Sequence, residues 1–293
     1  MNNKTELKDI PIMPQVATKI IKLQEDNLDI SFKELGNIIL LDPALTAKIL
    51  KVANSALYAR QKEITSIQQA ITLLGFKTIK SLVLLVCASN IFGKSKKRLK
   101  SSSELYKSKS SEIEIWRHLV LTAFLARHIS TSLNLDQYNE EIFIAGLLHD
   151  IGRIILLINN SEAYEGFLET LCNKTEQDIL SIEEEIFGYH HAEVGKIVLE
   201  KWNFPDELID TVYQHHSTSV DSAHKKMILI VALANLYSRI LSDESFSDRD
   251  VQQKEEYMKA LNLTPEIDEY ITTHFMKDIE NDELFTMSTD LIE

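Results

Sequence analysis

The chain has 293 residues, and its 44% hydrophobic content is enough for a continuous core in one large domain or two small ones. Its 44 acidic and 31 basic side chains leave a net charge of −13. A surface of that sign repels phosphate backbones, so we do not expect nucleic acid as a partner. Only eight glycines and five prolines interrupt long stretches rich in Leu, Ile, Ala, Glu and Lys. This composition predicts an all-α fold.

The sequence also bears on where the protein works. The first ten residues lack the basic-then-apolar pattern of a signal segment, and the apolar run at 82–88 is far shorter than the roughly 20 residues of a membrane span. Cys87 and Cys172 are isolated in apolar surroundings, which is typical of reduced thiols in cytosolic proteins. We therefore expect a cytoplasmic protein that does not contact a membrane.

Residues 1–93 are predicted to form an N-terminal half of short amphipathic helices, because apolar residues recur three and four positions apart. Asp42 and Pro43 mark one helix start, since the aspartate can cap free backbone N–H groups and the proline has no N–H to lose. Ser66 marks another start, and Gly75 can adopt the left-handed turn that ends that helix.

A basic, serine-rich stretch follows at 94–110 and is predicted to be a solvated linker, with docking of an acidic surface as the alternative. Helical periodicity then resumes through 111–241, the second helical subdomain. After a polar, acidic break, 242–293 is expected to be a helical extension, with a helix starting at Thr264 and Pro265. The helices expected within the second subdomain are 116–130, 141–158, 175–202, 206–216 and 227–241.

Histidines are concentrated at or beside the helices of the second subdomain. Imidazole is a common ligand of Zn, Fe, Mn and Ni, and a helical bundle can direct ligands from several helices to one interior point. A single histidine is more often an ordinary core or surface residue. The adjacent pair His149 and Asp150, inside the apolar run GLLHDIGRIIL, is stronger evidence, because a buried aspartate needs a cation or hydrogen-bond donors. The six histidines are His118, His149, His190, His191, His215 and His216.

The order of these residues resembles the ligand series of the HD metal-dependent phosphohydrolase superfamily. In that superfamily a first histidine, the His-Asp pair and a final aspartate hold one metal, and further histidines hold a second in the HD-GYP branch. The resemblance implies two neighbouring metal sites, with Asp150 as a ligand that bridges them. The implied ligands of the first metal are His118, His149 and Asp150, and those of the second are His191, His215 and His216.

A closer resemblance covers residues 10–240, which is most of the chain. The segments IPIMPQVATKII, LLDPALTAKILKVANSALY and ITSIQQAITLLGFKTIKSLVL resemble the N-terminal helical half of the HDOD family, the HD-related output domains of bacterial signalling proteins. The segment HAEVGKIVLEKWNFPDELIDTVYQHH resembles its second half. The resemblance implies a multi-helical regulatory module whose partners are other signalling proteins.

Three departures weaken the case for catalysis. Asn235 stands where an HD enzyme has its final aspartate, so a neutral amide replaces an anionic ligand. Arg153 replaces the lysine that follows the HDIG motif, and its planar group could still hold a phosphate. After His215 and His216 the chain has neither the glutamate nor the glycine-tyrosine-proline motif of the HD-GYP branch.

Three readings of the function follow. The favoured one is a stand-alone HDOD module that acts through protein-protein contacts and carries a vestigial site for one or two divalent ions, with Fe, Mn, Zn, Ni and Mg as candidates. The alternative is a metal-dependent phosphohydrolase of phosphodiesters or nucleotides, in which Asp150 and Arg153 would take part in catalysis. A helix-turn-helix DNA-binding reading has little support, because its recognition helix would offer only Lys48 and Lys51.

Two further features carry weaker predictions. The acidic run 183–185 is expected to be a solvated helix face, with one glutamate near the metal site as the alternative. In the extension, Ile267, Ile271 and Phe275 recur at four-residue spacing, so this segment is expected to pack on the domain or a partner. No glycine-rich phosphate loop and no GxSxG nucleophile motif occurs in the sequence.

Overall fold

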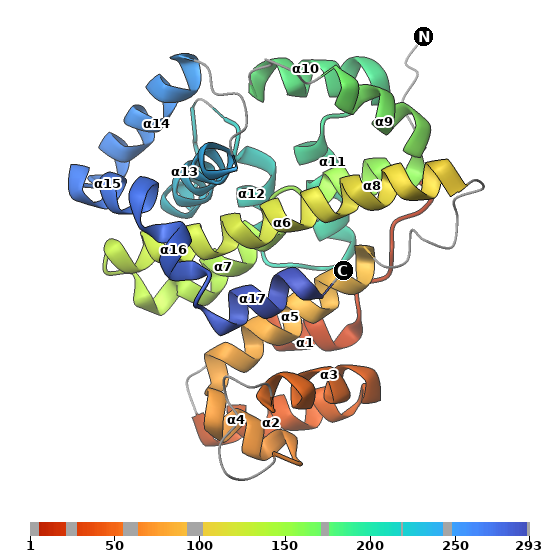
Figure 1. Cartoon of the computed structure of the whole chain (residues 1–293), viewed down its shortest axis with the longest axis vertical. Coiled ribbons are helices and arrows are strands. Elements are labelled where there is room, and N and C mark those ends of the chain that lie inside the picture. The colour runs from red at the N-terminus through yellow and green to blue at the C-terminus, as the bar shows by residue number, and fades with distance from the viewer. Residues whose placement is uncertain are drawn as a thin grey trace.

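Helices form the regular structure of the described residues, and no strand occurs among them, so the all-α prediction is confirmed (Figure 1). The structure is a computed structural model. It describes residues 6–21, 28–54, 64–92, 102–170, 176–217, 219–242 and 248–291.

The N-terminal half begins its helices where the sequence predicted. Asp42 Oδ1 accepts hydrogen bonds from the N–H groups of Ala44 and Leu45, at 3.0 and 3.1 Å. Ser66 caps the next helix, and Gly75 ends it with a φ of 84°, a region that favours glycine. The helices of this half are α1 (Gln15–Ile21), α2 (Leu28–Leu40), α3 (Pro43–Ala53), α4 (Ile67–Leu74) and α5 (Phe76–Phe92).

The second half is built around α6 (Ser102–Ser132), which crosses the middle of the molecule in Figure 1. This helix begins inside the segment expected to be a linker, and 94–101 lies outside the described residues. The division into subdomains stays a prediction. The elements that follow α6 are η2 (Asp136–Tyr138), α7 (Asn139–Leu148), α8 (Ile151–Asn159), α9 (Ser161–Glu169), α10 (Glu176–Phe187), α11 (His191–Lys201), α12 (Asp206–Gln214) and α13 (Lys225–Leu241).

Two predicted helices are in fact broken, and glycines help explain both breaks. The expected helix 141–158 is the pair α7 and α8, which meet at His149 and Asp150. Gly152 lets α8 approach α11 closely, since a Cβ there would lie 1.9 Å from the carbonyl oxygen of His191. The expected helix 175–202 is likewise the pair α10 and α11, with Gly188 at a φ of 77° between them. Periodicity alone did not predict these breaks, because the apolar spacing continues across them.

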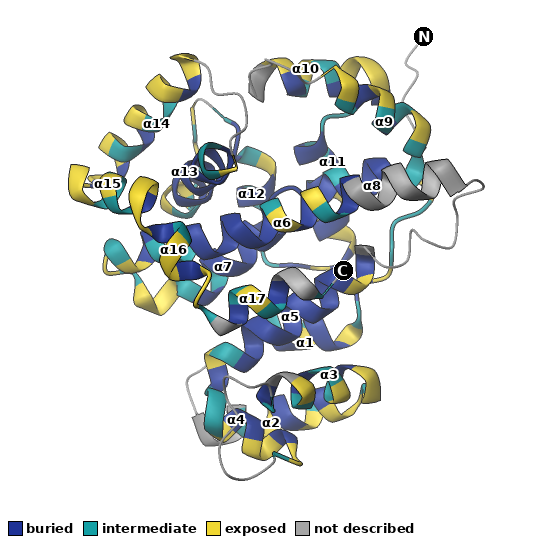
Figure 2. Cartoon of the chain, in the orientation of Figure 1, coloured by how far each residue is buried: buried dark blue, intermediate teal, exposed yellow. Residues whose placement is uncertain are grey.

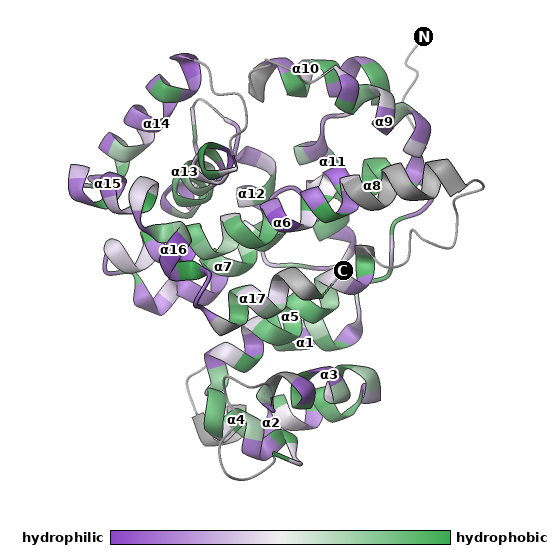
Figure 3. Ribbon diagram, viewed as in Figure 1, coloured by the Kyte–Doolittle hydropathy of each residue, from purple (hydrophilic) through white to green (hydrophobic). Residues whose placement is uncertain are grey.

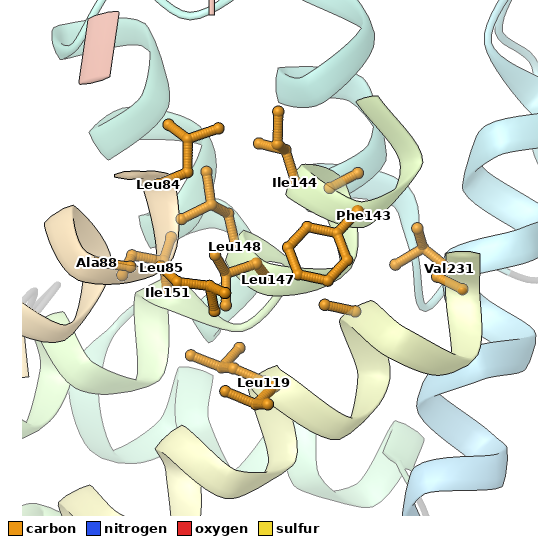
Figure 4. Packing of buried hydrophobic residues seen from close by; sticks show 14 of the residues in the cluster. Leu84, Leu85, Ala88, Leu119, Phe143, Ile144, Leu147, Leu148, Ile151 and Val231 are labelled. Carbon is orange, nitrogen blue, oxygen red and sulfur yellow. The ribbon is translucent and has the colours of Figure 1, made fainter. Parts of the chain in front are cut away.

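The core surrounds α7. Figure 4 shows the apolar side chains of α7, including Leu147 and Leu148, among those of α5, α6 and α13, and these three helices pack on α7. Figure 2 shows α7 and α13 buried over most of their length, whereas α10 and α14 keep exposed outer faces. Because α7 is enclosed on every side, the residues that follow it are also held in the interior.

The extension packs against the second half. Its helices α14 and α15 contact α13, and α17 contacts α5 and α6. Trp116 Nε1, on α6, donates a 2.7 Å hydrogen bond to the carbonyl oxygen of Ser288. Ile271 and Phe275 are buried, as expected for a packing face, and Figure 3 shows that α14 and α15 are otherwise rich in hydrophilic residues. The helices are α14 (Asp248–Leu261), α15 (Pro265–Thr273), α16 (Phe275–Ile279) and α17 (Glu283–Asp290).

None of the described helices is long and apolar enough to cross a membrane by itself. The helices α4 and α5 reach that length and apolarity only when taken together, and the chain bends by 116° between them.

Candidate metal centre

Four places in the second half supply the side chains of the centre. His118 lies on α6, and His149 with Asp150 forms the junction between α7 and α8. His191 is the first residue of α11. The remaining pair, His215 and His216, directly follows α12.

Local hydrogen bonds orient the rings. His149 Nδ1 lies 2.8 Å from the carbonyl oxygen of Gly146, and His215 Nδ1 lies 2.8 Å from that of Val212. Because a carbonyl only accepts, each ring donates from Nδ1 and keeps Nε2 as the atom with the lone pair. Both Nε2 atoms are directed toward Asp150.

Asp150 lies at the centre, with a different set of histidines at each oxygen. Its Oδ2 is 3.7 Å from His118 Nε2 and 3.6 Å from His149 Nε2. Its Oδ1 is 3.0 Å from His191 Nε2 and 3.4 Å from His215 Nε2. This arrangement matches a carboxylate that bridges two neighbouring sites.

Ring nitrogens converge in pairs on either side of this carboxylate. His118 Nε2 and His149 Nε2 are 3.2 Å apart, and His191 Nε2 and His216 Nε2 are 2.9 Å apart. Two nitrogens that bind the same ion, each at about 2.0–2.1 Å, lie about 3 Å from each other. The spacing therefore suits either a shared proton or a cation between each pair.

The centre is almost closed to solvent. The side chains of His149, Asp150 and His191 are fully buried, whereas that of His118 is 15% exposed and that of Arg153 is 16% exposed. Arg153 Nε lies 2.8 Å from Asp150 Oδ2. Parts of the His118 and Arg153 side chains therefore reach solvent.

Burial and neighbouring charges shift the ionisation of the cluster. Burial by itself would raise the pKa of Asp150, but Arg153, His149 and His191 outweigh it and hold that pKa well below the ordinary value. Burial lowers the pKa of His149 and of His216 well below the ordinary value. Burial would also lower the pKa of His191, but Glu183 and Asp150 outweigh it and raise that pKa to about 9.

The residues present fit a divalent cation. His215 Nε2 and Asn235 Oδ1 are buried without a hydrogen-bond partner, and Asp150 is an anion in the interior. Unpaired polar atoms of this kind are costly in a folded protein. The donor set of imidazole nitrogens and one carboxylate is the chemistry that divalent transition metals prefer. Within the centre, two groups of side chains offer ligand atoms close enough for one ion each: Asp150, His191, His215 and His216; and His118, His149 and Asp150. A third group, Glu184, His190 and Glu193, lies nearer the surface.

Ser238 connects α13 to the centre, and Asn235 lies near it on the same helix. Ser238 Oγ lies 3.1 Å from His118 Nδ1, and Asn235 lies one helical turn earlier on α13 and is buried. The sequence did not indicate Ser238, because α13 is apolar and buried on nearly all sides and offers no contrasting polar stripe.

Glu183 also belongs to the centre, so the expectation of a solvated face at 183–185 is wrong at this position. Its Oε2 accepts hydrogen bonds from the backbone N–H of His191, at 2.8 Å, and from His191 Nδ1, at 2.6 Å. Glu184 and Glu185 are exposed, as expected. The sequence did carry a signal for the burial of Glu183. The residues Ile179, Glu183 and Phe187 are four positions apart, and all three lie on the buried face of α10.

The comparisons with known proteins agree with this fold. The sequence model of the HDOD domain matches residues 10–218. The fold is that of an all-helical domain class with a histidine-aspartate cluster in its interior. Within it, this chain belongs to the HDOD domain family.

Similar proteins come from several bacteria. An uncharacterised protein of Treponema pallidum (strain Nichols) is 25% identical over 239 residues, which are 80% of this chain and 43% of that protein, so this chain spans less than half of its length. An HDOD domain protein of unknown function from Geobacter sulfurreducens has a TM-score of 0.73 at 21% identity, covering 97% of this chain and 94% of that one.

Two more solved structures share the fold. A Marinobacter aquaeolei protein provisionally assigned to signal transduction has a TM-score of 0.71 at 17% identity, covering 97% of this chain and 60% of that one. A Shewanella amazonensis protein provisionally assigned as a phosphohydrolase has a TM-score of 0.67 at 18% identity, covering 98% and 97%. At these identities the likeness establishes the fold.

Proposed function

We propose that this chain is a signal-transduction regulator whose histidine-aspartate centre binds divalent metal and whose surface contacts other signalling proteins. The observation that carries the proposal is the buried Asp150 carboxylate with imidazole groups at both oxygens, in a chain of the HDOD family. Support for the signalling role comes from the Marinobacter protein with the same fold.

Two ions would share Asp150. The first would be held by His118, His149 and Asp150, with the amide of Asn235 in place of the anionic ligand that HD enzymes have. The second would be held by Asp150, His191, His215 and His216. A bound divalent ion would neutralise the buried carboxylate and link the helices that carry the ligands.

Burial supports a structural role over turnover. His149, Asp150 and His191 are fully buried, so a substrate phosphate could reach them only if neighbouring helices moved. The neutral Asn235 side chain also leaves the first site with less negative charge to hold a hard cation. Both features favour a metal that stabilises the module.

Metal analysis tests the binding site. The full chain, purified without added metal, would be treated with a chelator, supplied with Fe, Mn, Zn, Ni or Mg in separate samples, and analysed by mass spectrometry for bound metal. We expect one or two ions per chain, lost in the double variant His149→Ala, Asp150→Ala and retained in His224→Ala, which removes a histidine outside the cluster. A protein that binds no metal, and whose stability is the same with and without added metal, would refute the site.

The phosphohydrolase alternative is favoured by the partly exposed Arg153 side chain beside Asp150, where a cation could hold a substrate phosphate. The Shewanella protein with the same fold is provisionally assigned that activity. Metal-loaded protein would be assayed against bis(p-nitrophenyl) phosphate and against nucleotides. Turnover that is abolished in Asp150→Asn and kept in His224→Ala would establish the enzyme and refute the purely regulatory role.

A further inference from the structure

A second site lies where the extension meets the far end of α6. A cavity of about 380 Å³ opens there between α6, the start of α7 and α15–α17. Figure 1 shows α15 and α16 beside the C-terminal end of α6. Phe124, the first residue of α6 to line the cavity, is six residues after His118, or about 9 Å along the helix axis. The cavity is therefore separate from the metal centre.

Arg127 supplies hydrogen-bond donors to this cavity. Its guanidinium carbon lies 4.6 Å from the ring centre of Phe124 and 5.1 Å from that of Phe143, so two aromatic rings hold the cation in place. Its closest carboxylate partner among the described residues is Asp282 Oδ2, at 4.0 Å, which is longer than a hydrogen bond. The guanidinium therefore presents donors that an incoming acceptor can use.

Acceptors line the same cavity. Asn139 Nδ2 donates to Thr131 Oγ1 and to Asp136 Oδ1, which holds this side chain at the edge of the cavity. Asp278 Oδ2 accepts from the hydroxyl of Tyr270. Asp282 Oδ1 caps α17 through the N–H of Phe285. In both Asp278 and Asp282, one carboxylate oxygen is therefore engaged in a hydrogen bond within the protein, and the other can accept a hydrogen bond from a ligand.

The remaining lining is largely aromatic. His128 stacks on Tyr270, with ring centres 5.0 Å apart, and meets Phe275 edge to face at 5.3 Å. Burial lowers the pKa of His128, so its ring is neutral near pH 7. A cavity with aromatic walls and a few converging polar groups is typical of a small-molecule site, and its volume falls at the lower end of the roughly 300–1,000 Å³ of such sites.

We propose that this cavity binds a nucleobase, as the free base or as a nucleoside. The gap between Arg127 and Asp282 places a donor beside an acceptor, which matches the neighbouring acceptor and N–H donor on one edge of a planar heterocycle. The second carboxylate, Asp278, accepts a further N–H group, and the aromatic walls contact the ring. The two carboxylates outnumber the one guanidinium, so the cavity repels the negative charge of an attached phosphate. The carboxylate of an amino acid bound at Arg127 would likewise be repelled by Asp282.

Calorimetric titration of the full chain tests this class of ligand. The probes are inosine, uridine, adenosine and cytidine, and we expect at least one of them to bind with a Kd below about 1 mM. Blocking the donor edge, as in 1-methylinosine or 3-methyluridine, should weaken binding of the parent nucleoside about tenfold or more, and a 5′-phosphate should weaken it as well. Absence of binding by all four nucleosides, equal binding of ribose, tighter binding of glycine or alanine, or indifference to the methyl group would each overturn the proposal.

Two variants assign the binding to this cavity. Arg127→Gln removes the guanidinium, and Asp282→Asn keeps a good helix cap but replaces the acceptor that faces Arg127 with an amide. Each is expected to weaken nucleoside binding about tenfold, whereas Lys277→Gln, on the same helix as Asp278 but outside the lining, should leave it unchanged. Circular dichroism establishes that each variant is folded. Should Arg127→Gln fail to fold, the conservative Asp282→Asn decides, and unchanged binding in that variant would refute the site.

Discussion

Two adjacent regions of the α7–α8 segment are equally buried but are stabilised in opposite ways. The side chains of Leu147 and Leu148 lie in the apolar core, where every square ångström taken from water contributes about 25 cal/mol. His149 and Asp150, the next two residues, are also fully buried, but their burial is unfavourable unless charges or a cation compensate it. Burial by itself therefore does not tell which residues hold the fold and which hold a ligand.

The difference between the two regions is that the apolar one should be independent of pH and metal, whereas the polar one should depend on both. The polar region continues into the side chains packed around Asp150, where His191 has a raised pKa and both His215 and Asn235 have unpaired atoms. Stability measured under changed conditions can separate the two contributions.

Leu147→Ala should give the largest effect. Removing a fully buried leucine side chain from the core costs about 3 kcal/mol, through lost burial and the cavity left behind. Urea unfolding at pH 6.5 and at pH 9, with and without metal, should give the same loss each time. A loss below about 1 kcal/mol, or one that changes with metal, would mean that the two regions are not independent.

The metal-free protein should lose stability between pH 6.5 and 9. The folded pKa of His191 is raised to about 9, so its stabilisation is fully present below the unfolded pKa near 6.5 and disappears as the pH rises through about 9. The expected loss is on the order of 2–3 kcal/mol. His149 and His216 have lowered pKa values and are neutral in the folded state, but in the unfolded state they are half protonated at pH 6.5. As they lose that charge, each offsets about 0.4 kcal/mol of the loss.

Glu183→Gln provides the matched comparison for this effect. Without the Glu183 carboxylate beside Nδ1, the raised pKa of His191 should fall and the stability profile should flatten. Glu184→Gln removes the next, exposed carboxylate on the same helix and should keep the wild-type profile. Equal profiles in both variants would show that the pH dependence has another source.

Asn235→Leu tests the unpaired amide oxygen. In the metal-free protein the change removes a buried polar atom that has no hydrogen-bond partner, so we expect a gain of about 1 kcal/mol in the free energy of unfolding. The same variant should gain less stability than the wild type when metal is added, because a proposed ligand atom of the first site is lost. A metal-free variant less stable than the wild type would show that the amide is already well accommodated.

Much of the fold could be predicted from the sequence, because local signals determine it. The cap at Asp42, the cap at Ser66 and the turn at Gly75 all depend on neighbouring residues, and the structure has each of them. The break between α7 and α8 could not be predicted, because the apolar spacing continues across it, and the close approach of Gly152 to α11 is a contact between distant segments.

The candidate centre was only partly predictable for the same reason. The order of the histidines suggested which residues converge, and the structure brings five of the six around Asp150, whereas His190 lies in a separate group with Glu184 and Glu193. Glu183 could have been recognised from the buried stripe of α10, whereas Ser238 could not. The cavity that includes Arg127, Asn139 and Asp282 had no sequence signal, since its walls come from segments more than a hundred residues apart.

Glu140→Gln should give the smallest effect, because it tests a single polar group within the apolar region. Glu140 is buried at the start of α7, where Ser81 Oγ donates to its Oε2 at 2.5 Å. Burial raises its pKa, against the opposing effects of Ser81 and Arg127. A carboxyl with a raised folded pKa stabilises the protein most below its unfolded value near 4.5, and that contribution is lost as the pH rises through the folded value.

The glutamine side chain of that variant would stay neutral at every pH and could still accept from Ser81. Above the folded pKa of Glu140, Glu140→Gln should therefore be more stable than the wild type, by no more than about 1 kcal/mol, and the difference should shrink toward pH 4. Urea midpoints at pH 4, 5, 6 and 7 measure it. The opposite result, in which the stability of the variant relative to the wild type is lower at pH 7 than at pH 4, would mean that Arg127 holds Glu140 as an ion pair. The apolar region would then share the charge dependence of the histidine-aspartate centre.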